Sequence, residues 1–102
     1  MKTIEIALLP PASIDAAEVF FRKHLNKVTA HFEQSQGDLV LIFPHAETDH
    51  DDWRRAAARD LARKFAPQRV NIISGGEESD QSEALVYLRD APGITGQYLP
   101  LA

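Results

Sequence analysis

The stretch LARKFAPQRVNIISGG, residues 61–76, combines the end of a helix, a strand and a turn. Its first part continues a helical pattern that Pro67 ends, because proline cannot continue a helix. The following RVNIIS, residues 69–74, has the length and the apolar, β-branched character of a strand. Two glycines, Gly75 and Gly76, then supply a turn. The stretch therefore predicts a helix that leads directly into a strand.

The region before this stretch supplies another strand and the body of the helix. LVLIFP, residues 39–44, is a continuous apolar run, which is typical of a strand covered on both faces. Helical spacing from about Asp51 to Phe65 predicts one long helix. Its apolar stripe is Trp53, Ala57, Leu61 and Phe65. Its small residues, which allow close approach by another element, are Ala56, Ala58 and Ala62.

The first third of the chain predicts one strand and one helix. Residues 2–9 alternate, with Ile4, Ile6 and Leu8 on one side, so we expect a strand that ends at the proline pair of residues 10–11. Ser13 is a good helix N-cap. The apolar stripe of the helix that follows is Ile14, Ala17, Phe21, Leu25, Val28 and Phe32.

The end of this first helix is open on the sequence alone. The apolar stripe favours a helix that continues to about Gln34. The alternative is a helix that stops near Asn26 and a strand at residues 27–33, which the β-branched Val28 and Thr29 would suit.

The last third predicts a short helix at residues 81–90, a loop at residues 91–96 and a final strand at residues 97–101. Strands and helices thus alternate along the whole chain, which predicts a parallel sheet with right-handed crossovers and helices on its faces. We expect a single α/β domain over residues 1–102. It would be a small three-layer, Rossmann-like domain with a mostly parallel sheet of about four strands.

Composition excludes several classes of function. The chain of 102 residues has a net charge of −4 and no basic run, which argues against nucleic acid as a partner. It has no cysteine, so disulfides, thiolate catalysis and thiolate zinc sites are excluded. No apolar run approaches the roughly 20 residues that span a bilayer, and the start lacks the features of a signal peptide. We therefore expect a cytoplasmic protein without a membrane partner.

Two phrases of the second half, RVN at residues 69–71 and ITGQ at residues 94–97, occur in an order shared with a known family. With the helix end at residues 65–67, they make residues 50–101 resemble the C-terminal half of the short-chain dehydrogenase/reductase family. In that family a long helix ends in a Leu-Ala-Pro-like segment, an Arg-Val-Asn strand follows, and ITGQ precedes the last strand. Residues 1–45 match only as a general strand-helix-strand pattern.

The departures from this family concern its chemistry. The Gly-rich phosphate loop is missing from the sequence. Glu47 and Asp51 stand where the family has its Tyr-x-x-x-Lys pair, and FPHA, residues 43–46, has no serine where the family has its catalytic one. Gly75 replaces the proline of the family's Pro-Gly. The resemblance therefore implies the scaffold without catalytic residues, and we expect no cofactor and no enzymatic activity.

The stretch PHAETDHDDW, residues 44–53, carries two histidines and four acidic side chains. One hypothesis is a metal site built by His45, Asp49 and His50, although this spacing is not typical of zinc. The favoured interpretation is helix capping, with Thr48 or Asp49 as the N-cap and an acidic residue in the first turn. An acidic edge of this kind would also repel the pyrophosphate of a dinucleotide.

Two other groups of polar residues are interpreted as surface features. His24 and His31 share a face of the first helix beside the apolar stripe, as surface or interface residues do. The long helix has a basic side that we interpret as solvated: Arg54, Arg55, Arg59, Arg63 and Lys64. SGGEES, residues 74–79, is interpreted as a tight turn rather than an anion cradle.

These observations favour a non-catalytic domain for oligomerisation or protein interaction. The resemblance implies subunit contacts through the long helix and the last strand, so the candidate interface residues are Trp53, Ala56, Ala58, Ala62 and Tyr98. We expect a homodimer or tetramer, or an accessory subunit of a full-length dehydrogenase. The alternative is a small-molecule- or metal-binding protein, or a hydrolytic or acid-base enzyme, that uses the rim from His45 to Asp52.

Overall fold

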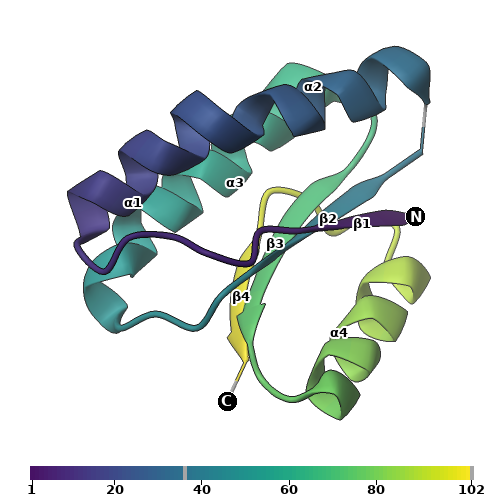
Figure 1. Cartoon of the computed structure of the whole chain (residues 1–102). Coiled ribbons are helices and arrows are strands. Elements are labelled where there is room, and N and C mark those ends of the chain that lie inside the picture. Colours follow the sequence, from purple (N-terminus) through teal and green to yellow (C-terminus); the bar gives the residue numbers. More distant parts are fainter. Residues whose placement is uncertain (36, 102) are drawn as a thin grey trace.

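The computed structural model describes residues 1–35 and 37–101, in which four parallel strands form one sheet (Figure 1). The strands lie in the order of the sequence: β1 (Lys2–Glu5), β2 (Leu39–Phe43), β3 (Val70–Gly75) and β4 (Tyr98–Leu101). The predicted α/β, Rossmann-like class is confirmed. Gln36 and Ala102, which the expected domain includes, lie outside the described residues.

The helices match the predicted elements closely. A continuous helix consists of α1 (Ser13–Val19), the π-helical turn η1 (Phe20–His24) and α2 (Leu25–Gln34), so residues 27–33 are helical and the strand alternative is wrong. A 3₁₀ turn, η2 (Thr48–His50), leads into α3 (Asp51–Phe65). The last helix, α4 (Glu78–Asp90), begins three residues before its predicted start at residue 81. Within the described part of the chain, no helix has the length and apolar character needed to cross a membrane.

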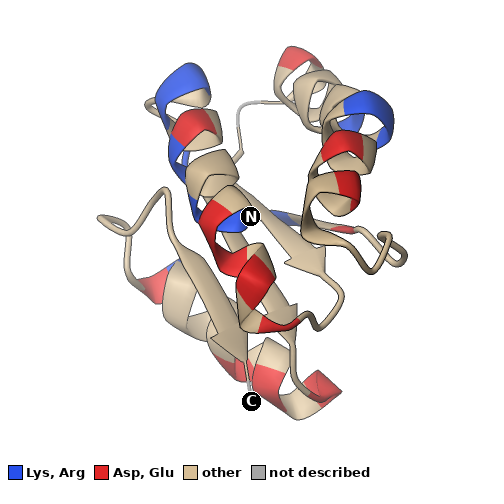
Figure 2. Ribbon diagram, turned by 90° about the vertical axis from the view of Figure 1, so that its left-hand side faces the viewer, with Lys and Arg blue, Asp and Glu red and all other residues tan. Residues whose placement is uncertain are grey.

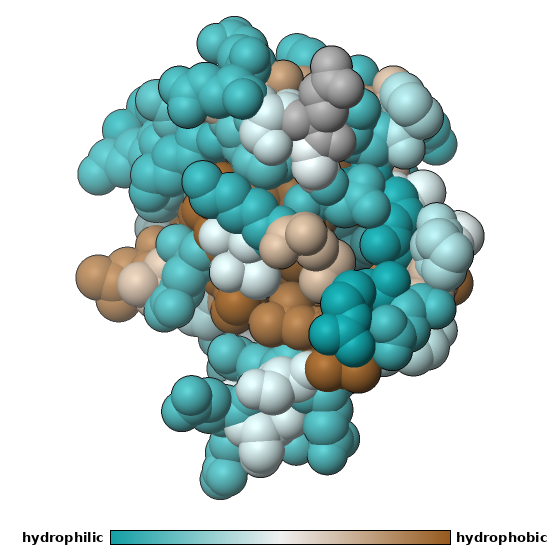
Figure 3. All heavy atoms as spheres, turned by 90° about the vertical axis from the view of Figure 1, so that its right-hand side faces the viewer, coloured by the Kyte–Doolittle hydropathy of each residue, from teal (hydrophilic) through white to brown (hydrophobic). Residues whose placement is uncertain are grey.

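The sheet is covered on both faces (Figure 1). Along β2, Leu39, Leu41 and Phe43 point to the face of α1, α2 and α3, where the larger core lies. Val40 and Ile42 point to the face of α4. This two-sided burial explains why the strand is a continuous apolar run, since side chains alternate between the faces of a sheet. In the space-filling view of Figure 3, apolar atoms are visible in the middle of one side, between hydrophilic atoms above and below.

The three crossovers do not share one hand. Each connection moves the chain one strand in the same direction across the sheet, but α1–α2 and α3 lie on one face and α4 on the other. The third crossover is therefore opposite in hand to the first two, and the prediction that all are right-handed, which holds in about 98% of cases, is wrong. The helix α3 packs on both β3 and β4. It therefore already covers that face of the sheet beside β3 and β4, and α4 lies on the other face.

The first helix differs from its predicted stripe by one residue. Phe20 is fully buried, whereas Ile14 and Phe21 are 80% and 45% exposed. The physical reason is the π-helical turn, in which the backbone N–H of Leu25 donates to Phe20 O, five residues back. This extra residue aligns Phe20 with Leu25 and so restores the predicted face at Val28. A stripe drawn at α-helical spacing cannot detect that shift.

Two other N-terminal predictions are wrong. The strand expected at residues 2–9 ends at Glu5, and Leu8 is 84% exposed, although Ile6 N still donates to Ile42 O over 2.8 Å. The proline pair that follows cannot donate to a ladder, so the chain leaves the sheet before it. Ser13 is the first residue of α1 rather than its N-cap, which is Ala12.

The two histidines of the first helix, His24 and His31, differ in burial. His31 is buried, its Nε2 lies 2.9 Å from Gly37 O, and its ring meets Phe32 edge-on. The surface interpretation of His31 is therefore wrong. His24 is half-buried, and burial together with Lys27 and Lys23 lowers its pKa.

A matched pair of variants tests the π-helical turn. Phe20→Leu should lower the free energy of unfolding by about 1–2 kcal/mol, because it leaves space in the core. Phe21→Leu should change it by about 0.5 kcal/mol or less, since Phe21 is half-exposed. Urea unfolding of both variants measures the difference. A larger loss for Phe21→Leu would show that the α-helical register is correct and the π-helical turn is not.

Candidate functional site

The carboxyl ends of parallel strands are the usual place for a ligand, and here they form an acidic edge. Figure 2 shows Asp and Glu side by side at the starts of α3 and α4, near this edge, with Lys and Arg at the far end of α3. The edge is built by the loop at residues 44–50 after β2 and the turn at residues 75–77 after β3.

His50 is a structural residue of this edge. Its side chain is buried, its Nε2 donates to Pro11 O over 3.0 Å, and its Nδ1 accepts from Trp53 Nε1 over 3.4 Å. Both ring nitrogens are therefore engaged. This pair of contacts holds the loop before α1 against the start of α3, two segments 39 residues apart in the sequence.

The structure does not assemble the predicted metal candidates. His45 is 73% exposed, and its Nε2 lies 3.7 Å from a Glu47 oxygen. Asp49 is exposed in η2, and His50 has no free nitrogen. In the part of the chain that the structure describes, no group of three potential metal ligands lies close enough to hold an ion.

The capping interpretation of this stretch is wrong in detail. Thr48 and Asp49 lie in η2, the N-cap of α3 is His50, and no side chain makes the cap hydrogen bond. Asp51 and Asp52 nevertheless occupy the first turn, where carboxylates interact favourably with the helix dipole.

A true capping box lies at α4. Glu77 is its N-cap, and the backbone N–H of Glu77 donates to Asp80 Oδ2 over 2.9 Å. The glycines before it, Gly75 and Gly76, have positive φ angles of 65° and 73°, as the predicted turn requires. The acidic pair at three-residue spacing was the sequence signal for this cap, and interpreting the whole segment as a turn missed it.

The positions of the family's Tyr-x-x-x-Lys pair hold Glu47 and Asp51, which lie beside neighbouring side chains. Glu47 is 88% exposed beside His45, and Asp51 lies 3.8 Å from Arg55 one helical turn later. Neither side chain has the hydroxyl or the ammonium group that the pair supplies in the family.

Arg54 is the residue that the sequence interpretation misplaced. The sequence predicts Arg54 on a solvated basic side of the helix, but the residue is 1% exposed. Its Nη1 donates to Pro44 O over 3.0 Å and to Tyr98 Oη over 3.2 Å. Its guanidinium carbon lies 4.9 Å from the centre of the Phe43 ring. The sequence does contain a signal of this burial. Arg54 is four residues before buried Ala58 and seven before buried Leu61, a spacing that puts all three on one face of the helix.

The contacts of Arg54 extend into the sheet. Tyr98 Oη lies 2.9 Å from Ser74 Oγ, and both residues are buried. This network joins the start of α3 to β3, β4 and the end of β2. Beside it, a hollow of about 360 Å³ opens at the ends of β1 and β2, and Arg54 and His45 form part of its wall.

The candidate interface residues differ in how far they are buried within the domain. Ala58 and Tyr98 are buried within the domain, while Trp53, Ala56 and Ala62 are half-buried. The close approach predicted for the small residues involves the chain's own loop: a Cβ added at Gly96, where φ is +73°, would lie 3.3 Å from the Cβ of Ala62.

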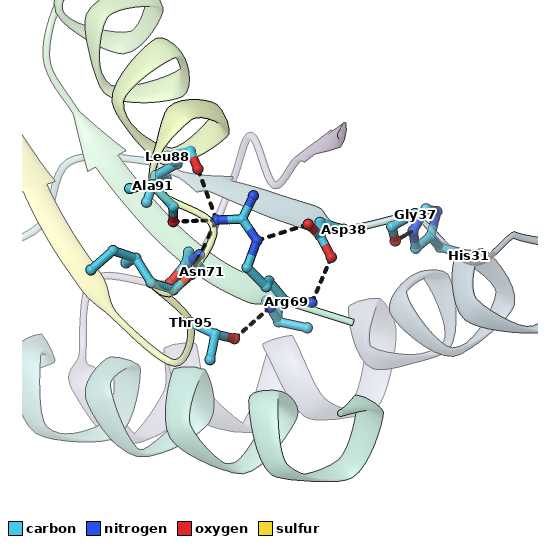
Figure 4. Close-up of polar contacts among 10 residues, drawn as sticks. His31, Gly37, Asp38, Arg69, Asn71, Leu88, Ala91 and Thr95 are labelled. Carbon is cyan, nitrogen blue, oxygen red and sulfur yellow. Dashed lines mark hydrogen bonds and ion pairs between the residues drawn. The ribbon is translucent and has the colours of Figure 1, made fainter. Parts of the chain in front are cut away.

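The family phrases RVN and ITGQ meet at the opposite, amino edge of the sheet, where they form one polar cluster (Figure 4). Arg69 Nε donates to Asp38 Oδ2 over 2.7 Å, and Arg69 Nη1 donates to the carbonyls of Leu88 and Ala91 over 2.8 Å. Asn71 Nδ2 donates to the carbonyl of residue 94 over 3.1 Å. The conspicuous phrases of the sequence therefore have a structural role here.

Hydrogen bonding determines the charge state of this cluster. Burial alone would raise the pKa of Asp38, but the backbone and side-chain hydrogen bonds and the positive charge of Arg69 outweigh it, so the pKa of Asp38 is lowered. The Asp38 carboxylate therefore stabilises the fold above its ordinary pKa, and that contribution is lost as the pH falls through the lowered value.

A comparison with protein families decides the ancestry. The model of the family described as "SDR-like: Short chain dehydrogenase-like protein" matches residues 4–101. The chain belongs to this SDR-like family. The match extends the predicted likeness from residues 50–101 to the first strand and helix, which resembled the family only in general pattern.

Among curated proteins, two sorting nexins show a partial likeness to this SDR-like chain. Sorting nexin MVP1 of Candida glabrata is 32% identical over 63 residues, which are 62% of this chain and 12% of that protein. Sorting nexin MVP1 of Saccharomyces cerevisiae is 33% identical over 73 residues, 62% of this chain and 14% of that protein. The chain thus spans about one eighth of the length of these relatives. No solved structure gives a significant match.

Substitution of the two rim histidines tests their roles. His50→Ala should lower the free energy of unfolding by about 1–3 kcal/mol, because Pro11 O and Trp53 Nε1 lose a buried partner. His45→Ala should change it by about 0.5 kcal/mol or less, since its side chain is exposed. Urea unfolding measures both values. Stabilisation of the parent protein by zinc or magnesium that disappears in both variants would instead support a metal site.

Proposed function

We propose that this SDR-like chain is a non-catalytic interaction domain that forms a homodimer through α4 and β4. Two features support the absence of dehydrogenase activity. The positions of the family's catalytic pair hold Glu47 and Asp51, and the strand end that would carry its serine reads FPHA. The carboxyl edge is acidic, which is unfavourable for the pyrophosphate of a nicotinamide cofactor.

The observation that carries the dimer is an apolar hollow of about 500 Å³ beside the last strand. It is lined by Asp80, Glu83, Ala84 and Tyr87 of α4 and by residues 99–101 of β4. Tyr87 is 55% exposed, although a tyrosine ring offers large contact area for an interface. An exposed aromatic residue beside an apolar depression is typical of a protein contact.

The geometry of β4 indicates what kind of contact this is. β4 lies at the edge of the described sheet, and Pro100 in its middle is exposed and has no N–H to donate. A proline on an edge strand disfavours a continuous sheet between two chains. Packing of α4 and Tyr87 against the same elements of a second copy avoids this restriction and gives a symmetric interface.

A second copy of this chain is the partner for the α4–β4 hollow that requires the fewest assumptions. The resemblance to the short-chain dehydrogenases implies subunit contacts through the last strand, and a small domain gains stability from association. A full-length dehydrogenase with a matching surface would be bound in the same way, so an accessory-subunit role is an extension of this proposal. The half-buried Trp53, Ala56 and Ala62 of α3 belong to a separate surface.

Light scattering after size exclusion tests the proposal. The protein at high micromolar concentration should have the mass of a dimer. Tyr87→Glu should shift it to the monomer, because dimerisation would remove the new carboxylate from water. Phe21→Glu is the matched control, since Phe21 is similarly exposed on a different helix. A strict monomer, or equal weakening by both variants, would contradict the α4–β4 interface.

A further inference from the structure

Arg54 carries a buried charge for which the described part of the chain offers no counter-ion. Its residue exposure is 1%, yet no carboxylate of the described residues lies within 4.0 Å of its guanidinium. Arg59 also lacks such a partner, but its side chain is exposed to water. A buried charge is ordinarily paired, because removal from water is costly.

The partners that Arg54 does have are neutral. A carbonyl and a phenol oxygen accept hydrogen bonds from Nη1, and the rings of Phe43, Trp53 and Tyr98 lie 4.9–5.8 Å from the guanidinium carbon. These contacts position the group and offset part of its desolvation. Arg54 Nε is buried without any hydrogen-bond partner. The guanidinium thus keeps an unpartnered donor and has no counter-ion among the described residues.

The same side chain forms part of the wall of the hollow at the ends of β1 and β2. The hollow measures about 360 Å³, which is within the usual range for small-molecule sites. One side is apolar and consists of residues 7–11, including the proline pair. The rest of the lining comes from the loop after β2, at residues 44–47, and from Asp49, His50 and Arg54.

We propose that this hollow binds a small monocarboxylate with an apolar body, whose carboxylate pairs with the guanidinium of Arg54. The buried cation, which has no counter-ion among the described residues, matches the negative charge of a carboxylate. The apolar wall at residues 7–11 matches a hydrocarbon or aromatic body. Glu47 and Asp49 in the same lining repel a dianion about twice as strongly as a monoanion, so the site favours a monocarboxylate over doubly charged phosphate.

This site is independent of the proposed interaction surface. It lies at the ends of β1 and β2, whereas the dimer hollow is lined by α4 and β4. Failure of either experiment therefore leaves the other proposal standing. Arg54 would act here as a binding residue, and no reaction of the ligand is implied.

The direct test measures binding of benzoate and hexanoate to the whole protein by thermal shift and by chemical-shift changes in ¹H–¹⁵N spectra. Benzamide and hexanamide have the same bodies without the charge, and inorganic phosphate supplies a dianion. Both carboxylates should raise the melting temperature in a concentration-dependent way and perturb Leu9, His45 and Ala46. No shift, an equal shift with amides or phosphate, or perturbation confined to another surface would overturn the proposal.

Three variants locate the interaction. Arg54→Met keeps much of the length of the side chain and should weaken carboxylate binding by at least about tenfold, the value expected for loss of a charged hydrogen-bond pair. Arg55→Met is the matched control, because Arg55 is exposed and does not line the hollow. Ala7→Phe fills the hollow from an exposed position and should also abolish binding. If Arg54→Met fails to fold, Ala7→Phe still decides, since unchanged binding there would overturn the proposal.

Discussion

The ion pair between Arg69 and Asp38 is the interaction on which the architecture depends most. One guanidinium joins the loop before β2 to the start of β3 and to the carbonyls of Leu88 and Ala91 at the end of α4. The last carbonyls of a helix have no partner within the helix, so an arginine beneath them satisfies groups that burial would otherwise make costly. Arg69 is only 11% exposed, which protects the pair from screening by solvent.

The amino and carboxyl edges of the sheet have different roles. The amino edge contains the RVN and ITGQ phrases of the SDR-like family, and their side chains hold the sheet, α4 and the last loop together. The carboxyl edge carries fewer such contacts and several exposed acidic side chains. His50 holds two loops together, while Glu47 and His45 are exposed. A scaffold retained at one edge is compatible with loss of chemistry at the other.

The sequence predicts the positions of the helices and strands better than it predicts which of their residues are buried. The bounds of α3 and the position of β2 followed from apolar runs and from Pro67, because burial on both sheet faces and proline both act locally. Phe20 could not be placed, since a π-helical turn has no reliable sequence signal. Arg54 was misplaced because its residue type was weighed above its spacing from Ala58. The opposite hand of the third crossover depends on the space already filled by α3, which only the complete structure shows.

The central proposal, that this SDR-like chain has the family's scaffold but does not bind a nicotinamide cofactor, is tested most directly by titration with nicotinamide cofactors. NAD, NADH, NADP and NADPH at millimolar concentration should leave the melting temperature of the protein unchanged, because a ligand that does not bind the folded state cannot stabilise it. A reproducible, saturable rise in melting temperature with any of the four would contradict the claim.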